Sequence, residues 1–275
     1  MQNLQSYLKN KRTRNEKLLS VYLTSGFPDL QATLPLLHAI ADGGADFIEL
    51  GVPFSDPLAD GTTIQAASQQ AISAGATLGF SLDIAKQFSQ KSDTPILLMG
   101  YANPFMHFGW DRLISHAKEA GVRGYIIPDL PPEESEDIAK QMQEAGQSLI
   151  FLASPNTSAE RIALIEDLTT SFIYAVSVTG TTGAREAFPA ETIAFLQRLR
   201  QQTKHPVLVG FGISGPQAAQ KMAALSDGVI VGSAMLNRIS ACNDMPSACQ
   251  AARDFAHEIK SNLLNNSEDE RDGNR

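Results

Sequence analysis

The sequence predicts a (β/α)8 barrel, or TIM barrel, that forms a single domain with an extra helix before its first strand. The main observation is that short apolar runs typical of buried parallel strands occur eight times, separated by stretches of helical period. A repeated unit supports this fold: a helix end, small residues and a buried strand follow one another in ADGGADFIELGVP, EAGVRGYIIPDLP and LSDGVIVGSA. The length of 275 residues also suits one such barrel.

The individual elements follow from the hydrophobic period along the chain. LQSYL and the charged residues after it predict the N-terminal helix. Gly43-Gly44, Gly121 and Gly146 are expected to end helices, because glycine readily adopts the left-handed conformation there. An open, doubly wound sheet is the alternative, but no GxGxxG motif follows the first strand. Strands are expected at residues 18–24, 46–51, 95–101, 124–128, 148–153, 171–177, 206–210 and 228–232, and helices at 30–42, 111–120, 133–145, 158–168, 190–202 and 216–225.

The barrel domain is expected to cover residues 1–264. Residues 265–275, NNSEDERDGNR, are polar and charged, and they are expected to form a disordered tail. No internal linker interrupts the repeated units, which favours one domain.

Composition excludes several classes of partner. The net charge of −8 argues against binding to nucleic acid or to an anionic membrane, since both need a basic face. No run of about 18 apolar residues occurs, so no membrane-spanning helix is expected. Two cysteines, Cys242 and Cys249, suit a reducing compartment, and we expect a cytoplasmic location. The basic cluster at residues 9–17 is an alternative targeting signal, but it lacks an apolar core and a cleavage site.

Glycines in the last two loops predict a phosphate site. In this fold the loops after strands 7 and 8 commonly bind phosphate at the C-terminal face of the barrel. Gly212 and Gly232 fall in these loops, and Ser233 begins a short helix whose free amides favour an anion. Gly183, in the loop after strand 6, adds a third glycine-rich turn. The alternative is that these glycines only form tight turns.

Acidic residues cluster at the end of the second strand. Glu49 lies between Ile48 and Leu50 in an apolar run, so its side chain points away from theirs. A carboxyl group near an apolar barrel mouth should have a raised pKa, which suits a general acid or base. A structural carboxylate is the alternative for Glu49. Asp60 could equally be a helix N-cap, and Asp56 could belong to a turn.

The residues at the other strand ends narrow the chemistry. No lysine lies at a predicted strand end, which disfavours a Schiff-base aldolase. The histidines and cysteines show no metal-ligand spacing, so no metal is expected. Acid–base chemistry on a phosphorylated substrate remains. Apolar and aromatic residues suggest an apolar half of that substrate, although core packing is the alternative for each: Tyr22, Leu98, Tyr101, Ile127, Tyr174 and Phe211.

Six motifs together resemble the tryptophan synthase alpha chain family. They are IELGVPFSDPLADG, LLMGYANP, GYIIPDLPPEES, SVTGTTGAR, VLVGFGIS and GVIVGSA, and they span most of the chain in the family's order. The resemblance implies a (β/α)8 barrel lyase in tryptophan biosynthesis. It would cleave indole-3-glycerol phosphate by a retro-aldol reaction to indole and glyceraldehyde 3-phosphate, without a cofactor.

The resemblance also implies roles for single residues. It assigns the family's catalytic glutamate to Glu49 and its catalytic aspartate to Asp60. The substrate-binding residues it implies are Tyr22, Tyr101, Ile127, Tyr174, Thr182, Gly183, Phe211, Gly212, Gly232 and Ser233.

A partner subunit follows from the same resemblance. The family's alpha chain pairs with a beta chain in an allosteric alpha2-beta2 heterotetramer, and the beta chain uses pyridoxal phosphate to join indole to serine. We expect Phe54, Asp56 and Leu58 to face this partner. A stand-alone indole-3-glycerol-phosphate lyase, a weakly active alpha-like subunit that mainly activates a partner, and a phosphate-binding barrel isomerase are the alternatives.

Overall fold

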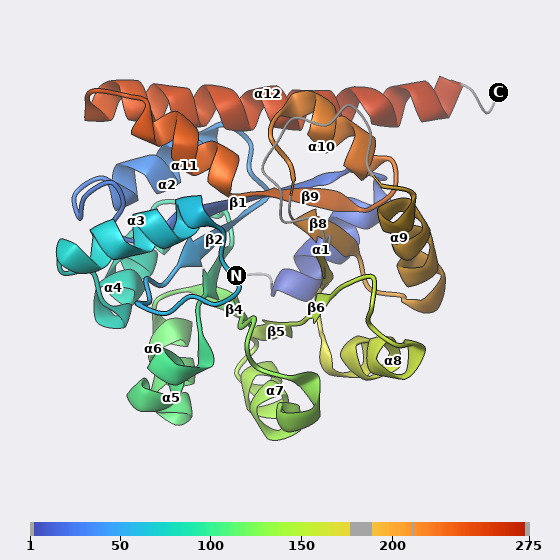
Figure 1. Ribbon diagram of the computed structural model, residues 1–275, viewed down its shortest axis with the longest axis horizontal. Coiled ribbons are helices and arrows are strands. Elements are labelled where there is room, and N and C mark those ends of the chain that lie inside the picture. The colour runs from blue at the N-terminus through green and yellow to red at the C-terminus, as the bar shows by residue number, and fades with distance from the viewer. Residues whose placement is uncertain (1–2, 177–188, 211, 273–275) are drawn as a thin grey trace.

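The sheet is a parallel barrel, as the sequence predicts. The computed structural model describes residues 3–176, 189–210 and 212–272, and side chains as far as Leu264. Among these residues, nine strands pair in the order β5-β4-β3-β2-β1-β9-β8-β7-β6, and every pairing is parallel (Figure 1). The strands are β1 Leu18–Thr24, β2 Phe47–Gly51, β3 Ile96–Met99, β4 Val122–Ile126, β5 Ser148–Ile150, β6 Leu152–Ala153, β7 Ile173–Val176, β8 Val207–Gly210 and β9 Gly228–Val231.

The predicted strand at 148–153 is divided into two. Its first part, β5, pairs with β4, and its second part, β6, pairs with β7. Between them, the carbonyl of Phe151 accepts a hydrogen bond from the amide of Tyr174 at 3.0 Å. One stretch of chain therefore connects the two ends of the sheet and closes the barrel.

Helices surround the barrel and connect its strands. The left-handed conformation predicted for glycines at helix ends is confirmed at Gly44, Gly121 and Gly146, where φ is +97°, +80° and +78°, whereas Gly43 is right-handed with φ of −72°. The helices are α1 Leu4–Thr13, α2 Thr33–Asp42, α3 Thr62–Ser73, α4 Leu78–Ser89, α5 Ala102–Phe108, α6 Trp110–Glu119, the short 3₁₀ helix η1 Pro132–Glu134, α7 Glu136–Glu144, α8 Ala159–Leu168, α9 Ala190–Gln202, α10 Pro216–Ala223, α11 Ser233–Ser240 and α12 Met245–Asp272.

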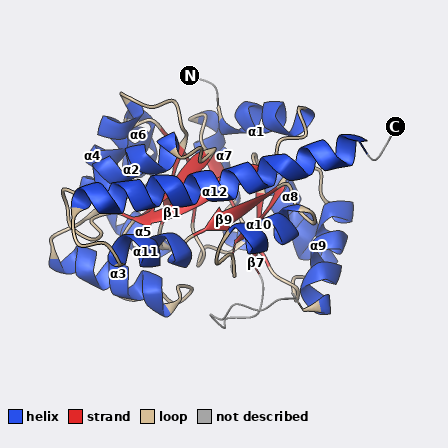
Figure 2. Cartoon of the chain, turned by 90° about the horizontal axis from the view of Figure 1, so that it is seen from above, coloured by secondary structure: helices blue, strands red, loops and turns tan. Residues whose placement is uncertain are grey.

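The long helix α12 crosses one side of the barrel. It packs against α2, α10 and α11 and also contacts strand β1 (Figures 1 and 2). It also continues past residue 264, so the backbone of residues 265–272 is helical, whereas the sequence predicted a disordered tail. None of these eight residues is glycine or proline, so nothing in this stretch interrupts a helix. None of the helices in the described part of the chain is long and apolar enough to cross a membrane.

Strand alternation separates two apolar layers. Ile48 and Leu50 of β2 belong to the cluster between sheet and helices, and Phe47 belongs to a second cluster inside the barrel. Leu4 and Leu8 of the predicted N-terminal helix α1 join this inner cluster and are almost fully buried. In Figure 2, α1 lies at the opposite end of the molecule from α3 and α11. Helix α1 thus closes the end of the barrel that the strands enter.

This arrangement predicts that Leu8→Ala destabilises the whole barrel. Leu8 is fully buried, and truncating such a leucine costs about 2–5 kcal/mol through lost transfer energy and a cavity. The control is Lys9→Ala in the same helix; Lys9 is exposed, so its loss should change stability by less than about 0.5 kcal/mol. Urea unfolding of both variants checks this, and equal effects would contradict a sealing role for α1.

Candidate functional site

Glu49 is a fully buried carboxyl group inside the barrel. In β2 it lies opposite Tyr22 of β1 and Leu97 of β3, and its side chain shares a face with Phe47. Ile48 and Leu50 belong to the cluster between sheet and helices and Phe47 to the cluster inside the barrel, so Glu49 points away from Ile48 and Leu50, as the sequence predicts. Its exposed fraction is 0%. Ser20 Oγ donates a hydrogen bond to Oε1 at 2.8 Å, whereas Oε2 has no hydrogen-bond partner. Burial raises the pKa of Glu49 to about 8, and the Ser20 hydrogen bond acts in the opposite direction.

Asp60 lies in the loop that leaves β2. Helix α3 begins at Thr62, and its N-cap residue is Gly61, which makes no side-chain cap. The backbone carbonyl of Asp60, not its carboxylate, accepts a hydrogen bond from Gln65 Nε2 at 2.9 Å. The capping alternative is therefore wrong for its side chain. Burial raises the pKa of Asp60 to about 6, while the hydroxyl of Tyr101 lowers it.

Two tyrosines lie across glycines at strand ends. A Cβ atom added to Gly51 would lie 2.2 Å from the hydroxyl oxygen of Tyr22. One added to Gly210 would lie 2.2 Å from the hydroxyl oxygen of Tyr174. Any larger residue at these positions in β2 and β8 would overlap one of the two rings, so the glycines allow Tyr22 and Tyr174 to lie inside the barrel.

Tyr22 and Tyr174 both lie near the carboxyl groups of Glu49 and Asp60. Burial raises the pKa of Tyr174, and the charges of Glu49 and then Asp60 raise it further. The pKa of Tyr22 is raised mainly by burial, then by Asp60. Both phenols thus stay neutral, and each lies within electrostatic reach of both carboxyl groups. The structure thereby places Glu49, Asp60, Tyr22 and Tyr174 in one site.

Tyr101 holds the loop between Glu49 and Asp60 against the barrel. Its hydroxyl accepts a hydrogen bond from the amide of Ala59 at 3.0 Å, and its ring lies 5.4 Å from that of Phe54. Leu58 of this loop is 91% exposed, and Asp56 is exposed as well. The apolar loop therefore has an inward anchor at Phe54 and an outward side chain at Leu58.

The predicted phosphate loops are described only in part. Gly212 has φ of +74°, a left-handed conformation that favours glycine. Ser233 is the first residue of α11, and Gly232 is its N-cap. The carbonyl of Gly232 accepts hydrogen bonds from the amides of Met235 and Leu236, and helix geometry leaves the amides of Ser233 and Ala234 without intrahelical partners. The remaining predicted residues of this site, Thr182, Gly183 and Phe211, lie outside the described residues.

Ile127 directly follows β4, at the C-terminal end of that strand. It is 3% exposed and lines a cavity of about 160 Å³ together with Asp129, Phe151 and Arg161. The Asp129 carboxylate accepts the amide of Ala102 at 2.8 Å, so it fixes the start of α5.

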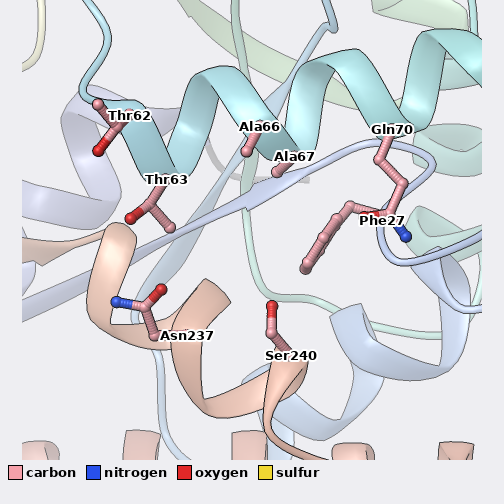
Figure 3. Close-up of a pocket in the computed structure, with 8 residues that line it drawn as sticks. All are labelled: Phe27, Thr62, Thr63, Ala66, Ala67, Gln70, Asn237 and Ser240. Carbon is pink, nitrogen blue, oxygen red and sulfur yellow. The ribbon is translucent and has the colours of Figure 1, made fainter.

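A larger cavity of about 340 Å³ lies between α3 and α11 (Figure 3). Phe27, Gln70 and Asn237 line it with five other residues, and neither Glu49 nor Asp60 is among them. The two predicted catalytic carboxyl groups therefore lie outside this cavity. Within the described residues, no group of three or more His, Cys, Asp or Glu side chains could hold a metal ion.

Sequence reasoning missed Ser20. It is fully buried and is the hydrogen-bond donor to Glu49. The signal was available, because Ser20 is the one polar residue before the end of the apolar run LLSVYLT and shares an inward face with Leu18 and Tyr22.

Burial of Glu49 makes a prediction about stability and pH. A carboxyl group whose pKa rises from 4.5 to about 8 on folding contributes most stability below pH 4.5, and the contribution is lost as pH rises to about 8. Glu49→Gln removes the ionisable group. We expect the variant to gain stability over the unmodified chain between pH 5 and pH 8, measured by urea unfolding at a series of pH values. A difference that does not vary with pH would contradict burial of a titrating Glu49.

Comparisons with known proteins identify the family. A family profile described as tryptophan synthase alpha chain matches residues 8–264. The chain is 45% identical over 226 residues to the tryptophan synthase alpha chain of Dehalococcoides mccartyi, covering 82% of this chain and 89% of that one. It is 41% identical to the alpha chain of Xylella fastidiosa, with coverage of 96% and 98%. The crystal structure of the subunit alpha from Legionella pneumophila superposes with a TM-score of 0.88 at 35% identity, covering 96% of this chain and all of that one. The chain belongs to the tryptophan synthase alpha chain family, the lyases that cleave indole-3-glycerol phosphate in tryptophan biosynthesis.

Proposed function

We propose that Glu49 and Asp60 are the catalytic residues with which this chain cleaves indole-3-glycerol phosphate. The observation that carries the proposal is the buried Glu49 carboxyl group, whose Oε2 has no hydrogen-bond partner. A buried polar atom without a partner is costly, and such atoms cluster where a substrate supplies the missing contact. With a pKa of about 8, Glu49 exchanges protons near neutral pH, as a general acid and base must.

The reaction needs one proton donated to the indole ring and one proton removed from a hydroxyl group of the substrate. Glu49 protonates C3 of the indole ring, which converts the ring to a cationic indolenine. The resulting carboxylate removes the proton from the hydroxyl group on the adjacent side-chain carbon. The bond between C3 and that carbon then breaks, its electron pair restores the neutral indole ring, and the oxygen becomes the aldehyde of glyceraldehyde 3-phosphate. Glu49 ends with the proton count it began with.

Asp60 complements this step from the loop. Its carboxylate accepts a hydrogen bond from the ring N–H and stabilises the positive charge that C3 protonation creates. A pKa of about 6 keeps Asp60 mostly ionised at neutral pH, while Glu49 stays mostly protonated. The two carboxyl groups thus have separated pKa values and different roles: protonated Glu49 supplies the proton, and ionised Asp60 stabilises the positive charge.

The rest of the site positions the substrate. We assign the phosphate to Gly212, Gly232 and Ser233, together with Thr182 and Gly183. This assignment is supported by the left-handed Gly212 and the N-terminal amides of α11. We assign the indole ring to the apolar residues Tyr22, Tyr101, Ile127, Tyr174 and Phe211.

We further propose that the chain acts with a beta chain in an alpha2-beta2 assembly in the cytoplasm. Members of the family pair with a beta chain. The exposed Leu58, beside Asp56 in the loop that carries Asp60, supports an interface there. Because Tyr101 anchors this same loop, contact with a partner would act directly on the position of Asp60. A stand-alone lyase is the second candidate, and high indole release by the isolated chain would favour it.

Substitution of the carboxyl groups tests the catalytic assignment. Glu49→Gln should lower kcat for indole release by about 10²-fold to 10⁴-fold with substrate binding largely retained, since it removes the acid–base group and keeps the shape. Asp60→Asn should lower kcat by roughly 10²-fold. Steady-state kinetics and substrate binding to the variants measure both effects. Substantial turnover by Glu49→Gln would refute the acid–base role.

Activation by the partner tests the interface. Asp56→Ala should reduce the stimulation of indole release by a family beta chain more than it reduces substrate binding by the isolated chain. Asp83→Ala in α4 is the control, because Asp83 is equally an exposed aspartate and lies outside the loop. Titration of each variant with the beta chain gives the activation. Weaker substrate binding with unchanged activation would count against the interface.

A further inference from the structure

Ser20 donates a hydrogen bond to only one of the two carboxyl oxygens of Glu49. It lies on β1 opposite Phe47. Tyr22, two residues further along the strand, lies opposite Glu49. Ser20 and Tyr22 share the inward face of β1, so the hydroxyl of Ser20 points into the barrel. It donates to Oε1 of Glu49 at 2.8 Å, and both residues have an exposed fraction of 0%.

The other carboxyl oxygen has no comparable contact. Oε2 of Glu49 is buried and has no hydrogen-bond partner. In a protonated carboxyl group, one oxygen carries the hydrogen and the other is free to accept. Since Oε1 already accepts from Ser20, the hydrogen belongs on Oε2.

We propose that Ser20 is a positioning residue that holds Oε1 of Glu49 and thereby leaves Oε2 as the oxygen that carries the catalytic proton. This inference rests on the proposed acid–base role of Glu49. In the reaction, the O–H bond at Oε2 breaks as the C3–H bond forms, and the proton of the substrate hydroxyl returns to Oε2. Ser20 keeps its own proton throughout and orients the group that reacts.

The hydrogen bond also sets how readily Glu49 ionises. Burial raises its pKa, and donation from Ser20 is the contact that lowers it, because a hydrogen bond stabilises the carboxylate. The other titratable groups around Glu49 are Tyr22 of β1, Tyr174 of β7 and Asp60 of the loop after β2. The two phenols have raised pKa values and remain neutral, and Asp60 ionises at lower pH than Glu49. Without the Ser20 hydroxyl, the pKa of Glu49 must therefore rise further.

The first test titrates the Glu49 carboxyl group directly in the full chain. Difference infrared spectroscopy across pH follows the protonated carboxyl band that Glu49→Gln lacks. We expect Ser20→Ala to move its midpoint upward by roughly one pH unit. Ser20→Thr keeps a hydroxyl and should return the midpoint toward that of the unmodified chain. If Ser20→Ala does not fold, as judged by circular dichroism, Ser20→Cys supplies a weaker donor and should give a smaller upward shift.

A matched control separates this effect from the loss of any buried serine. Ser171 is 2% exposed and its hydroxyl has no hydrogen-bond partner, and it contacts neither carboxyl group by a hydrogen bond. Ser171→Ala should leave the Glu49 midpoint unchanged. An unchanged midpoint in Ser20→Ala, or an equal shift in Ser171→Ala, would overturn the proposal.

The second test measures cleavage of indole-3-glycerol phosphate against pH. We expect Ser20→Ala to lower kcat by about tenfold with KM within about twofold, because orientation and not binding is lost. The fall of kcat at high pH should move upward with the infrared midpoint, and Ser20→Thr should restore both. An infrared shift with unaltered kinetics would overturn the positioning role. If Glu49→Gln retained cleavage while the infrared shift persisted, the proposed function of Glu49 would fail and the contact with Ser20 would stand.

Discussion

Burial of one carboxyl group inside a closed barrel is the constraint on which the site depends. Glu49 has no basic partner among the groups that shift its pKa, so the barrel lowers the cost of burying it by favouring the neutral form. That requires a dry interior. The apolar cluster inside the barrel and helix α1 below it supply this, and Phe151 closes the wall between β5 and β6.

The parallel arrangement then brings the other groups to the same place. All strands run in one direction, so their C-terminal ends lie at the same end of the barrel. The loop that follows β2 and carries Asp60 begins there, and so does α11 after β9. The glycines that end β2 and β8 are as important as the polar residues. They admit the rings of Tyr22 and Tyr174, which fill the interior without bringing a charge near Glu49. One loop carries both the half-buried Asp60 and the exposed Leu58, so the proposed catalytic group and the proposed interface are parts of one segment.

The sequence predicted most of the architecture because barrel strands have a strong local signal. Runs such as LLSVYLT and PVLVG are mostly apolar. The ends predicted for them agree with the ends of β1 and β8 to within one residue. Alternation predicted that Glu49 points away from Ile48 and Leu50, and the packing of those two residues against the helices shows that it points inward. The division of 148–153 was not predictable, since it depends on how the first and last parts of the sheet meet in space. The N-cap reading of Asp60 failed for a similar reason, because cap geometry decides between Asp60 and Gly61 and both are compatible with the local sequence. Ser20 was not predicted because its role depends on a hydrogen bond to a carboxyl group on the neighbouring strand, and that pairing is not visible in the sequence around a single serine.

The acid role of Glu49 depends on one property: because this carboxyl group is buried, it is mostly protonated at neutral pH. Carbon-13 NMR of the chain labelled at glutamate side chains, with Glu49→Gln used to assign the resonance, measures this ionisation in the resting protein. The account predicts a titration midpoint near 8 for Glu49. A midpoint near the ordinary glutamate value of 4.5 would contradict it.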